Sequence, residues 1–426
     1  MKITDIEIIP IFPPLAKRYS VFKTRWQAYQ RIVFKIHTDV GIIGYGDYDR
    51  YPWINTVTSV RTDDWKSRTP PAFSEVEHLI GRSPFEFMNN SLNLGLAAAL
   101  YDVMGKYLEV PAYKLLGQKL RDAGAVAAWS WGGPSPAQFA DEVRRAVGEG
   151  YMILKIHADP LMDIMEWTRA AEEVAPPEFR IHYDFTGRTR PTPTLGTMLP
   201  IVQEMERHPI VGWIEDPLPR FDIEGWRQLR AKSRIPIVHG GEPLLGGLQE
   251  VMLGMADIYM IGGDVGNTLA LGTAYGKANM QVILQNTGGT LMKAFTLHMA
   301  SVLPTATGHS INLDDQCEWD ITTETIPVIE GFSQVPEGPG LGLEVDEDAL
   351  ARAAAAEPPK PPEFIGITHM PGGHTLYSLG LPDISGITGR EQATIRGISF
   401  ERWIDDGTPE FRRTLARLQG DGTFME

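Results

Sequence analysis

Three apolar segments that follow one another along the chain each end in a carboxylate, and this pattern constrains the fold most. The segments begin near residues 179, 211 and 235, and they end at Asp184, Glu215 and Glu242. Each is typical of a short buried strand, and a buried carboxylate without a partner is costly. In a parallel barrel the carboxyl ends of the strands meet where active sites lie. Oxygen ligands that meet there suit a hard cation such as Mg²⁺.

Short β-like segments recur through the middle of the chain at intervals of about 25 residues, which leave room for one helix and two loops per unit. They begin near Ala125, Ile153, Phe179, Val211, Ile235, Ala256, Gln281 and, more weakly, Ala306. Eight such units predict an α/β protein with a (β/α)8 TIM-like barrel. An open doubly wound sheet is the alternative. We rank it below the barrel because no Gly-rich phosphate loop follows the first segment.

The segment ahead of the repeat predicts a separate part. Residues 31–47 are typical of a β-hairpin and residues 92–108 of a helix, so we expect a small α+β capping domain. One face of this helix is predicted to hold Leu92, Leu96, Leu100, Val103 and Tyr107. The predicted domains are 1–123 for the capping domain, 124–335 for the barrel, and 336–426 for a segment that returns to the capping domain and ends in a tail extension.

The tail has a distinct composition. Residues 349–357 predict a helix that stops at the proline-rich connector 358–362. Beyond it the local pattern is weak, but the chain keeps apolar and aromatic residues such as Phe364, Tyr377 and Trp403. Disordered tails are depleted in such residues. We therefore expect an ordered tail that packs on the capping domain or on a neighbouring subunit and helps to close the site.

Charge and cysteine content limit the possible partners. Over 426 residues the formal net charge is −15, which argues against nucleic acid and anionic membranes. The single cysteine, Cys317, excludes an internal disulfide framework and fits a reducing compartment. The first residues lack the pattern of a secretory signal, and no apolar stretch reaches about 18 residues. We expect a cytoplasmic enzyme.

Several motifs follow one another between about residues 30 and 350. They are Ala97–Lys106 with Leu115–Gly117 and Lys119–Asp122, then Trp213–Pro219 with Asp222–Gly225, then Gly241–Glu242 after Ile235–Pro236, and finally Gly338–Gly342. In this order they resemble the enolase superfamily, in its mandelate racemase and sugar-acid dehydratase branch. The resemblance implies a capping domain built from both chain ends around a (β/α)8 barrel.

The resemblance also implies the chemistry of the site. It makes Asp184, Glu215 and Glu242 the Mg²⁺ ligands. In the family the metal holds a substrate carboxylate while a base removes the α-proton, and the metal stabilises the enediolate that forms. The alternative for these acids is three unrelated loop carboxylates at strand ends.

Lys155 and His157 end the second strand of the predicted barrel. They lie two residues apart, so they point to one face of that strand. The family usually has Lys-x-Lys here, with the second lysine as the base. A histidine titrates near neutral pH without help and suits the same role. We therefore predict Lys155 and His157 as catalytic residues, with a structural ion pair beside the metal acids as the alternative.

The opposite face of the site lacks the second base of the family. Racemases and dehydratases of this branch place a histidine at the end of the seventh strand, where this chain has Gln285 and Asn286. The lysine that the lactonising and epimerising branches place on the sixth strand is also missing. These absences argue against a racemase that uses two bases. A reaction that needs one base, such as syn elimination of water, remains supported.

Three further residues at strand ends are predicted to bind substrate, namely Gln285, Glu318 and His239. Glu318 follows the eighth strand and matches a family acid that often lines the site, but a structural hydrogen-bonding role explains it equally well. For His239 and Gln285 the alternative is packing.

These observations predict a Mg²⁺-dependent lyase that dehydrates a sugar acid through an enediolate. A racemase or epimerase of a 2-hydroxy acid is the second hypothesis. A catalytically silent family member with a binding or assembly role is the third. The predicted partner is a small carboxylate substrate, and the family predicts a homo-oligomer of even order. The sequence does not name the sugar, because specificity lies in loops.

Overall fold

The structure of the chain is a computed structural model that describes residues 1–16, 29–49, 76–89, 92–130, 135–185, 193–240, 248–357, 363–384, 387 and 395–426. The chain divides into two compact units. Unit 1 comprises Met1–Lys17, Trp26–Ala128 and Tyr259–Pro359, and unit 2 comprises Arg18–Arg25, Trp129–Ile258 and Lys360–Glu426.

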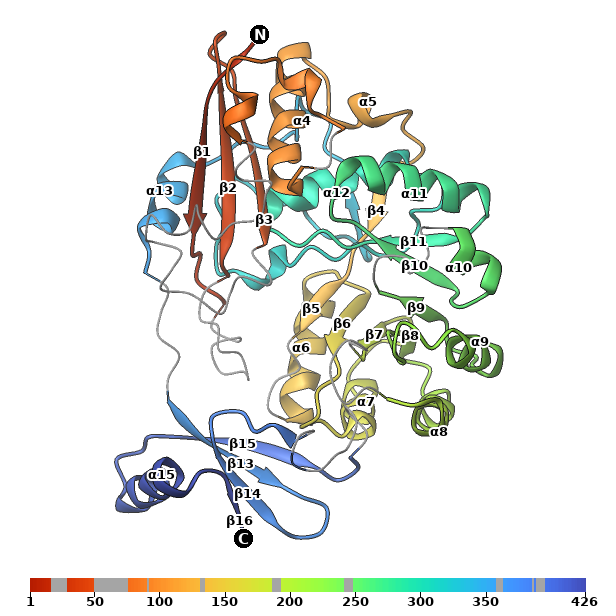
Figure 1. The fold of residues 1–426 in the computed structure, drawn as a ribbon, viewed down its shortest axis with the longest axis vertical. Helices are drawn as coiled ribbons and strands as arrows, with labels where there is room; N and C mark the ends of the chain where they lie inside the picture. The colour runs from red at the N-terminus through yellow and green to blue at the C-terminus, as the bar shows by residue number, and fades with distance from the viewer. Residues whose placement is uncertain are drawn as a thin grey trace. The chain divides into compact units, whose positions relative to one another are not determined.

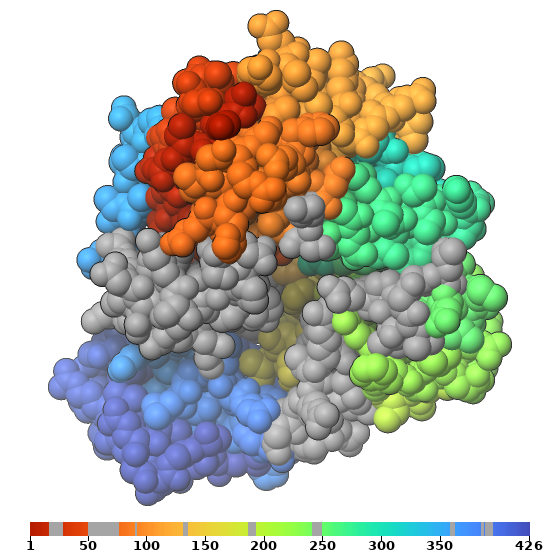
Figure 2. Space-filling model, turned by 45° about the horizontal axis from the view of Figure 1, so that its top comes forward, coloured from red at the N-terminus to blue at the C-terminus, as the bar shows by residue number. Residues whose placement is uncertain are grey.

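Unit 1 begins with a three-stranded antiparallel sheet of order β1-β2-β3 (Figure 1). Its strands are β1 (Ile3–Ile11), β2 (Arg31–Thr38) and β3 (Ile43–Asp49). The pairing of β2 with β3 confirms the predicted hairpin. Next to β1 runs the segment around Arg82, where Ile3 N donates to Arg82 O at 2.9 Å, and the red and orange surfaces of these segments adjoin in Figure 2.

Helix α4 (Leu94–Leu108) packs on this sheet and confirms the helix predicted over 92–108. The contact with β3 is close, because a Cβ at Gly46 would lie 2.1 Å from Gly95 O. The helix is buried along most of its length, since both the sheet and α12 (Thr290–Val302) contact it. The prediction of a single buried face was therefore too narrow, and Tyr107 in the last turn is 45% exposed.

A seven-stranded sheet has the order β11-β10-β9-β8-β7-β6-β5. Its strands are β5 (Ala128–Ser130), β6 (Ile153–His157), β7 (Arg180–Asp184), β8 (Val211–Glu215), β9 (Ile237–His239), β10 (Ile258–Ile261) and β11 (Gln281–Leu284). The pairs β6–β7, β7–β8 and β8–β9 are parallel. Parallel neighbours need a crossover connection. Helices provide it, namely α6 (Pro136–Gly148), α7 (Ile164–Glu172), α8 (Leu195–Met205), α9 (Ile223–Lys232), α10 (Leu248–Leu253) and α11 (Val265–Lys277).

A short segment takes the eighth strand position. Parallel bridges join Ser310 to Val126, just ahead of β5, and Ile311 to Gln285, just after β11. The topology is that of the predicted (β/α)8 barrel, with the α+β sheet and helix α4 as the cap. The eighth strand was expected near Ala306 and begins later, because Ala306 N donates to Leu303 O in a turn.

Smaller elements complete unit 1. They are α5 (Tyr113–Leu116), the paired strands β4 (Ala123–Ala125) and β12 (Phe332–Gln334), α13 (Glu347–Ala355), and the 3-10 helices Val76–Leu79, Pro84–Glu86 and Asp314–Gln316. Helix α13 confirms the helix predicted over 349–357. It starts earlier than predicted because the Asp346 side chain caps it by accepting from Ala349 N at 2.9 Å.

The tail, residues 363–426, folds into an antiparallel sheet of order β15-β13-β14-β16 with one helix. Its elements are β13 (Phe364–His369), β14 (Thr375–Leu379), β15 (Ser399–Ile404), α15 (Pro409–Asp421) and β16 (Phe424–Met425). Ile365, Phe411 and Leu418 form its inner cluster. The tail is ordered, as expected, and within unit 2 it packs on Leu161 of the loop after β6. Across the described ranges, no helix has the length and apolar character needed to cross a membrane.

Candidate active site

The carboxyl ends of β6, β7 and β8 lie next to one another and bring charged residues together. The parallel register pairs His157 with Asp184 and Asp184 with Glu215. It also pairs Lys155 with His182. Residues two apart on a strand point to one face, so Lys155 and His157 share a face. The same holds for His182 and Asp184 on the neighbouring strand.

The Lys155 ammonium lies between two carboxylates. Its Nζ is 3.1 Å from Asp184 Oδ2 and 2.5 Å from Glu215 Oε2. The lysine side chain is fully buried, and both carboxylates are nearly so. Burial disfavours the charged form, but the attraction of Glu215 and Asp184 outweighs it and raises the pKa of Lys155. Lys155 is therefore a buried cation.

His157 contacts the same cluster from a more open position. Its Nε2 lies 3.0 Å from Asp184 Oδ2, and its side chain is 41% exposed. The Trp129 ring of β5 meets the His157 ring edge to face. The centroid of the Trp129 ring also lies 5.6 Å from Lys155 Nζ, within the range of a cation–π contact. Trp129 thus contacts both predicted catalytic residues.

Two members of the cluster were not predicted from the sequence. His182 Nε2 lies 2.9 Å from Glu215 Oε2, and the His182 side chain is fully buried. Burial, followed by the charge of Lys155, holds the pKa of His182 well below its ordinary value, so the ring is neutral. Strand alternation back from Asp184 would have found His182. Trp129 is the other member. No pattern in the neighbouring residues indicates that its side chain points toward the site.

Two buried acidic side chains, Glu215 and Asp216, follow each other at the end of β8. Burial, followed by the charge of Asp184, raises the pKa of Glu215 to about 7. Burial, followed by the charge of Glu215, raises the pKa of Asp216 to about 7. Asp216 Oδ1 accepts a hydrogen bond from Gly240 N at 2.8 Å. A Cβ at Gly240 would lie 2.0 Å from Glu215 Oε1, so a glycine at this position leaves space for the carboxylate.

Two of the three predicted ligands are of the kind that a hard divalent cation prefers. Asp184 and Glu215 present carboxylate oxygens at adjacent strand ends. Glu242, the third predicted ligand, lies outside the described residues. Within the described ranges no group of three or more His, Cys, Asp or Glu side chains is arranged to hold a metal ion. The Mg²⁺ site therefore stays a prediction.

The three residues predicted to bind substrate lie in different places. His239 ends β9 in unit 2, is buried, and has its ring centroid 4.9 Å from that of Trp226 in α9. Gln285 directly follows β11, and Glu318 follows the 3-10 helix Asp314–Gln316. Gln285 and Glu318 belong to unit 1. Their roles, like that of His239, stay predictions.

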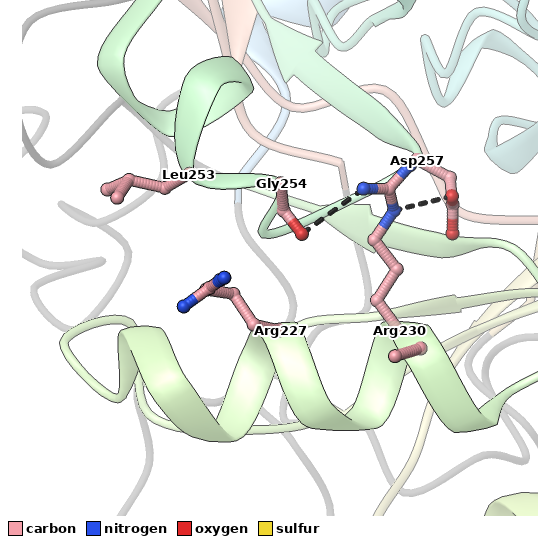
Figure 3. Close-up of a pocket in the computed structure, with 6 residues that line it drawn as sticks. Arg227, Arg230, Leu253, Gly254 and Asp257 are labelled. Carbon is pink, nitrogen blue, oxygen red and sulfur yellow. Dashed lines mark hydrogen bonds and ion pairs between the residues drawn. The ribbon is translucent and has the colours of Figure 1, made fainter.

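A separate pocket of about 470 Å³ lies at the amino ends of the strands (Figure 3). It is lined by Arg227, Arg230, Ala231, Leu253, Gly254 and Asp257. Arg230 donates to Asp257 Oδ1 at 2.7 Å and to Gly254 O at 3.2 Å. Asp257 Oδ2 accepts from Ile237 N, at the start of β9, at 2.9 Å. Arg230 and Asp257 pair with each other, and active sites of such barrels lie at the carboxyl ends of the strands. We therefore place the candidate active site at the carboxyl ends and not in this pocket.

Comparison with known proteins agrees with this fold. Residues 138–349 match the family model described as enolase C-terminal domain-like. A D-gluconate dehydratase from Thermoproteus tenax is 27% identical over 363 residues, which cover 78% of this chain and 71% of the relative. A D-xylonate dehydratase from Haloferax volcanii is 25% identical over 359 residues, which cover 76% of this chain and 85% of the relative. A dipeptide epimerase from Cytophaga hutchinsonii, solved with Mg and the dipeptide D-Ala-L-Val, has a TM-score of 0.69 at 20% identity and covers 82% of this chain and 98% of that one.

Fold and site together define the class of the protein. It has the topology of a (β/α)8 barrel with an α+β cap, and carboxylates meet at the carboxyl ends of its strands. In fold and in sequence the chain resembles the enolase superfamily, in its mandelate racemase and sugar-acid dehydratase branch, as its motifs predicted.

Proposed function

We propose that this protein removes the α-proton of a sugar-acid carboxylate and eliminates water from the neighbouring carbon. The observation that carries the proposal is the difference in environment between Lys155 and His157. Lys155 is buried as a cation between Asp184 and Glu215, whereas His157 is 41% exposed at the same strand end. The relatives named D-gluconate and D-xylonate dehydratase support the substrate class.

His157 is the group that takes the proton. Its Nε2 faces Asp184 Oδ2 at 3.0 Å, so we assign the hydrogen of the neutral ring to Nε2, where it is donated to this carboxylate. The lone pair on Nδ1 then accepts the α-proton. Lys155 cannot accept a proton while it is charged. Its ammonium instead offsets the negative charge that develops on the substrate carboxylate.

The same ring completes the elimination. The C–H electron pair moves into the substrate carboxylate and then returns to form a double bond between the α and β carbons. The β C–O bond breaks, and the departing hydroxide takes the proton from His157 Nδ1 and leaves as water. The enol that remains tautomerises to a 2-keto-3-deoxy acid. One base on one face suffices, in keeping with the absence of a histidine at Gln285.

Asp184, Glu215 and Glu242 are the residues that would hold Mg²⁺. When bound, this ion would supply positive charge to the substrate carboxylate and so make its α-proton more acidic. The Mg complex of the dipeptide epimerase supports this choice of cation.

Incubation of a sugar-acid library with the protein and Mg²⁺ in deuterated water tests the proposal. We expect a 2-keto-3-deoxy product, which proton NMR detects. Exchange with inversion and no keto product would identify a racemase or epimerase instead. A protein that gives neither is catalytically silent toward this library.

Two histidine variants tie the reaction to the site. His157→Asn is expected to abolish product formation because the proton acceptor is lost. His208→Asn is the matched control, since His208 pairs with Glu172 at 2.7 Å outside the strand-end cluster. Equal loss of activity in both variants would contradict the assignment of the base.

We also propose a homo-oligomer of even order, on the strength of the family resemblance and the even numbers that isologous contacts generate. Light scattering that finds a stable monomer at micromolar concentration would refute it. A cytoplasmic location, suggested by the single Cys317, stays a prediction.

A further inference from the structure

The tail reaches the loop between β6 and α7, which directly follows His157. Asp163 of this loop caps α7, because its Oδ1 accepts from Met165 N at 3.1 Å. The same carboxylate also contacts two residues of the tail. Gly397 N donates to Oδ2 at 2.8 Å, and Arg396 Nε lies 3.1 Å from Oδ1. The Asp163 side chain is 4% exposed, so the tail supplies positive charge and a hydrogen bond to a buried carboxylate of the barrel.

Arg396 extends this contact to a second helix. Its Nη1 donates to Glu204 Oε2 at 3.0 Å, and its Nη2 donates to Glu204 Oε1 at 3.3 Å. Glu204 lies in α8, so one guanidinium joins the start of α7 to α8. A planar guanidinium can hold a carboxylate with two nitrogens while its Nε engages another, and a lysine ammonium cannot reproduce that fork.

Leu161 adds an apolar contact at the same place. It is 5% exposed and forms one cluster with tail residues Leu376, Ile384, Ile395, Ile398 and Phe400. Burial of a leucine side chain away from water stabilises such a contact. The tail therefore holds the middle of the loop through Leu161 and its end through Asp163.

This loop begins directly after the candidate base, His157, which is the last residue of β6. Ala158 N, directly after His157, donates to Asp184 O at 2.7 Å and continues the β6–β7 pairing. The segment from His157 to Asp163 is thus anchored at one end by β7 and at the other by the tail. His157 is 41% exposed, so its position depends on how firmly this segment is held.

We propose that Arg396 is a positioning residue, through which the tail holds the β6–α7 loop and keeps His157 aligned for proton transfer. The catalytic part of this inference rests on the proposed function. The structural part does not, because the contacts among Arg396, Asp163 and Leu161 exist whatever the reaction is.

Three variants of the 426-residue chain test this role. Arg396→Met keeps the aliphatic stem but removes the fork, and Arg396→Lys restores the charge beside Asp163. Arg417→Met is the control, because Arg417 contacts only tail groups among its described partners, Glu426 at 2.5 Å and the Phe424 ring at 3.6 Å. Hydrogen–deuterium exchange of residues 158–165 measures how firmly the loop is held and needs no substrate. The kcat and KM for dehydration report whether His157 is aligned for proton transfer.

In Arg396→Met we expect amide exchange in this loop to rise at least about threefold. We expect kcat to fall about tenfold with KM within about twofold, because misplacement of a reacting group slows the chemical step. Arg396→Lys should recover part of both losses, and Arg417→Met should change neither. Unchanged loop exchange in Arg396→Met overturns the inference, and so does equal loosening in Arg417→Met. A looser loop with unchanged kcat overturns the positioning role. A looser loop in a protein without dehydratase activity supports the structural tie and refutes the proposed function.

Discussion

The ring of His157 stands edge-on to the ring of Trp129, with 4.6 Å between their centroids and 78° between their planes. Trp129 is 4% exposed, so a fixed side chain of β5 flanks the more open histidine of β6. Edge-to-face contact is a favoured geometry for aromatic rings, and it restricts the rotation of the smaller ring.

Replacement of Trp129 by leucine should therefore lower kcat for α-proton removal about tenfold, because His157 loses the surface that orients it. Trp129→Phe keeps a flat ring and should keep most of the activity. Steady-state kinetics on the substrate found in the library screen check both variants. A Trp129→Leu protein with the rate of the parent would contradict this role.

Substitution of Gly240 should damage the site without unfolding the protein. A Cβ there would lie 2.0 Å from Glu215 Oε1, so Gly240→Ala must displace that carboxylate. We expect Gly240→Ala to lose the rise in melting temperature that Mg²⁺ gives the parent protein. Gly148→Ala is the control, because its Cβ would meet nothing within 4 Å. Equal stabilisation of both variants by Mg²⁺ would count against Glu215 as a ligand.

Lys155→Met should lower the free energy of unfolding of the protein. The substitution leaves Asp184 and Glu215 buried without the ammonium that now lies 3.1 Å and 2.5 Å away. Removal of one partner of a buried ion pair costs about 3–5 kcal/mol, so we expect a loss of this size in the free energy of unfolding measured with EDTA. Added Mg²⁺ should restore part of it. Lys277→Met, at an exposed lysine, should change little, and equal stability of the two variants would refute the expectation.

Asp102→Ala should destabilise unit 1. Asp102 accepts from Tyr45 N and Leu341 N at 2.9 Å each, and from Lys106 Nζ at 2.7 Å, so it ties α4 to β3 and to a later segment. Loss of a buried acceptor for three donors should cost about 3 kcal/mol in urea unfolding. Asp141→Ala, at an exposed pair, should cost less than about 1 kcal/mol. Similar costs for both would show that the buried network contributes little.

His298 should make stability depend on pH. Burial lowers the pKa of His298 from 6.5 to about 4. The unfolded chain binds a proton near pH 6.5 and the folded chain does not until near pH 4, so the contribution is complete above pH 6.5 and is lost as pH falls toward 4. Between pH 7 and 4.5 the free energy of unfolding should drop about 2–3 kcal/mol more in the parent protein than in His298→Gln. Identical slopes in denaturant titrations would contradict this.

Much of the fold could be predicted from local pattern. The hairpin that ends at Asp49, helix α4 and the strand that ends at His157 all follow from alternation or helical periodicity, which neighbouring residues carry. The eighth strand was misplaced because the weak β-like segment near Ala306 is used in a turn. Whether such a segment forms a strand or a turn depends on what it packs against.

The site was partly accessible from sequence for the same reason. Charged residues at strand ends drew attention to Lys155, His157 and Asp184, and strand alternation would have added His182. Trp129 was missed, because a tryptophan in an apolar run is usually core. Its contact with the candidate base arises only when β5 and β6 are neighbours in the sheet.

By itself the sequence determined which segments become strands and helices and which strands end in charge, because alternation, periodicity and helix caps act over a few residues. Only the tertiary structure decided that the tail holds the loop behind His157. Gly397 and Asp163 are 234 residues apart and still form one hydrogen bond. No local pattern encodes such a pair, since its partners meet only after both parts have folded and their apolar surfaces around Leu161 have packed.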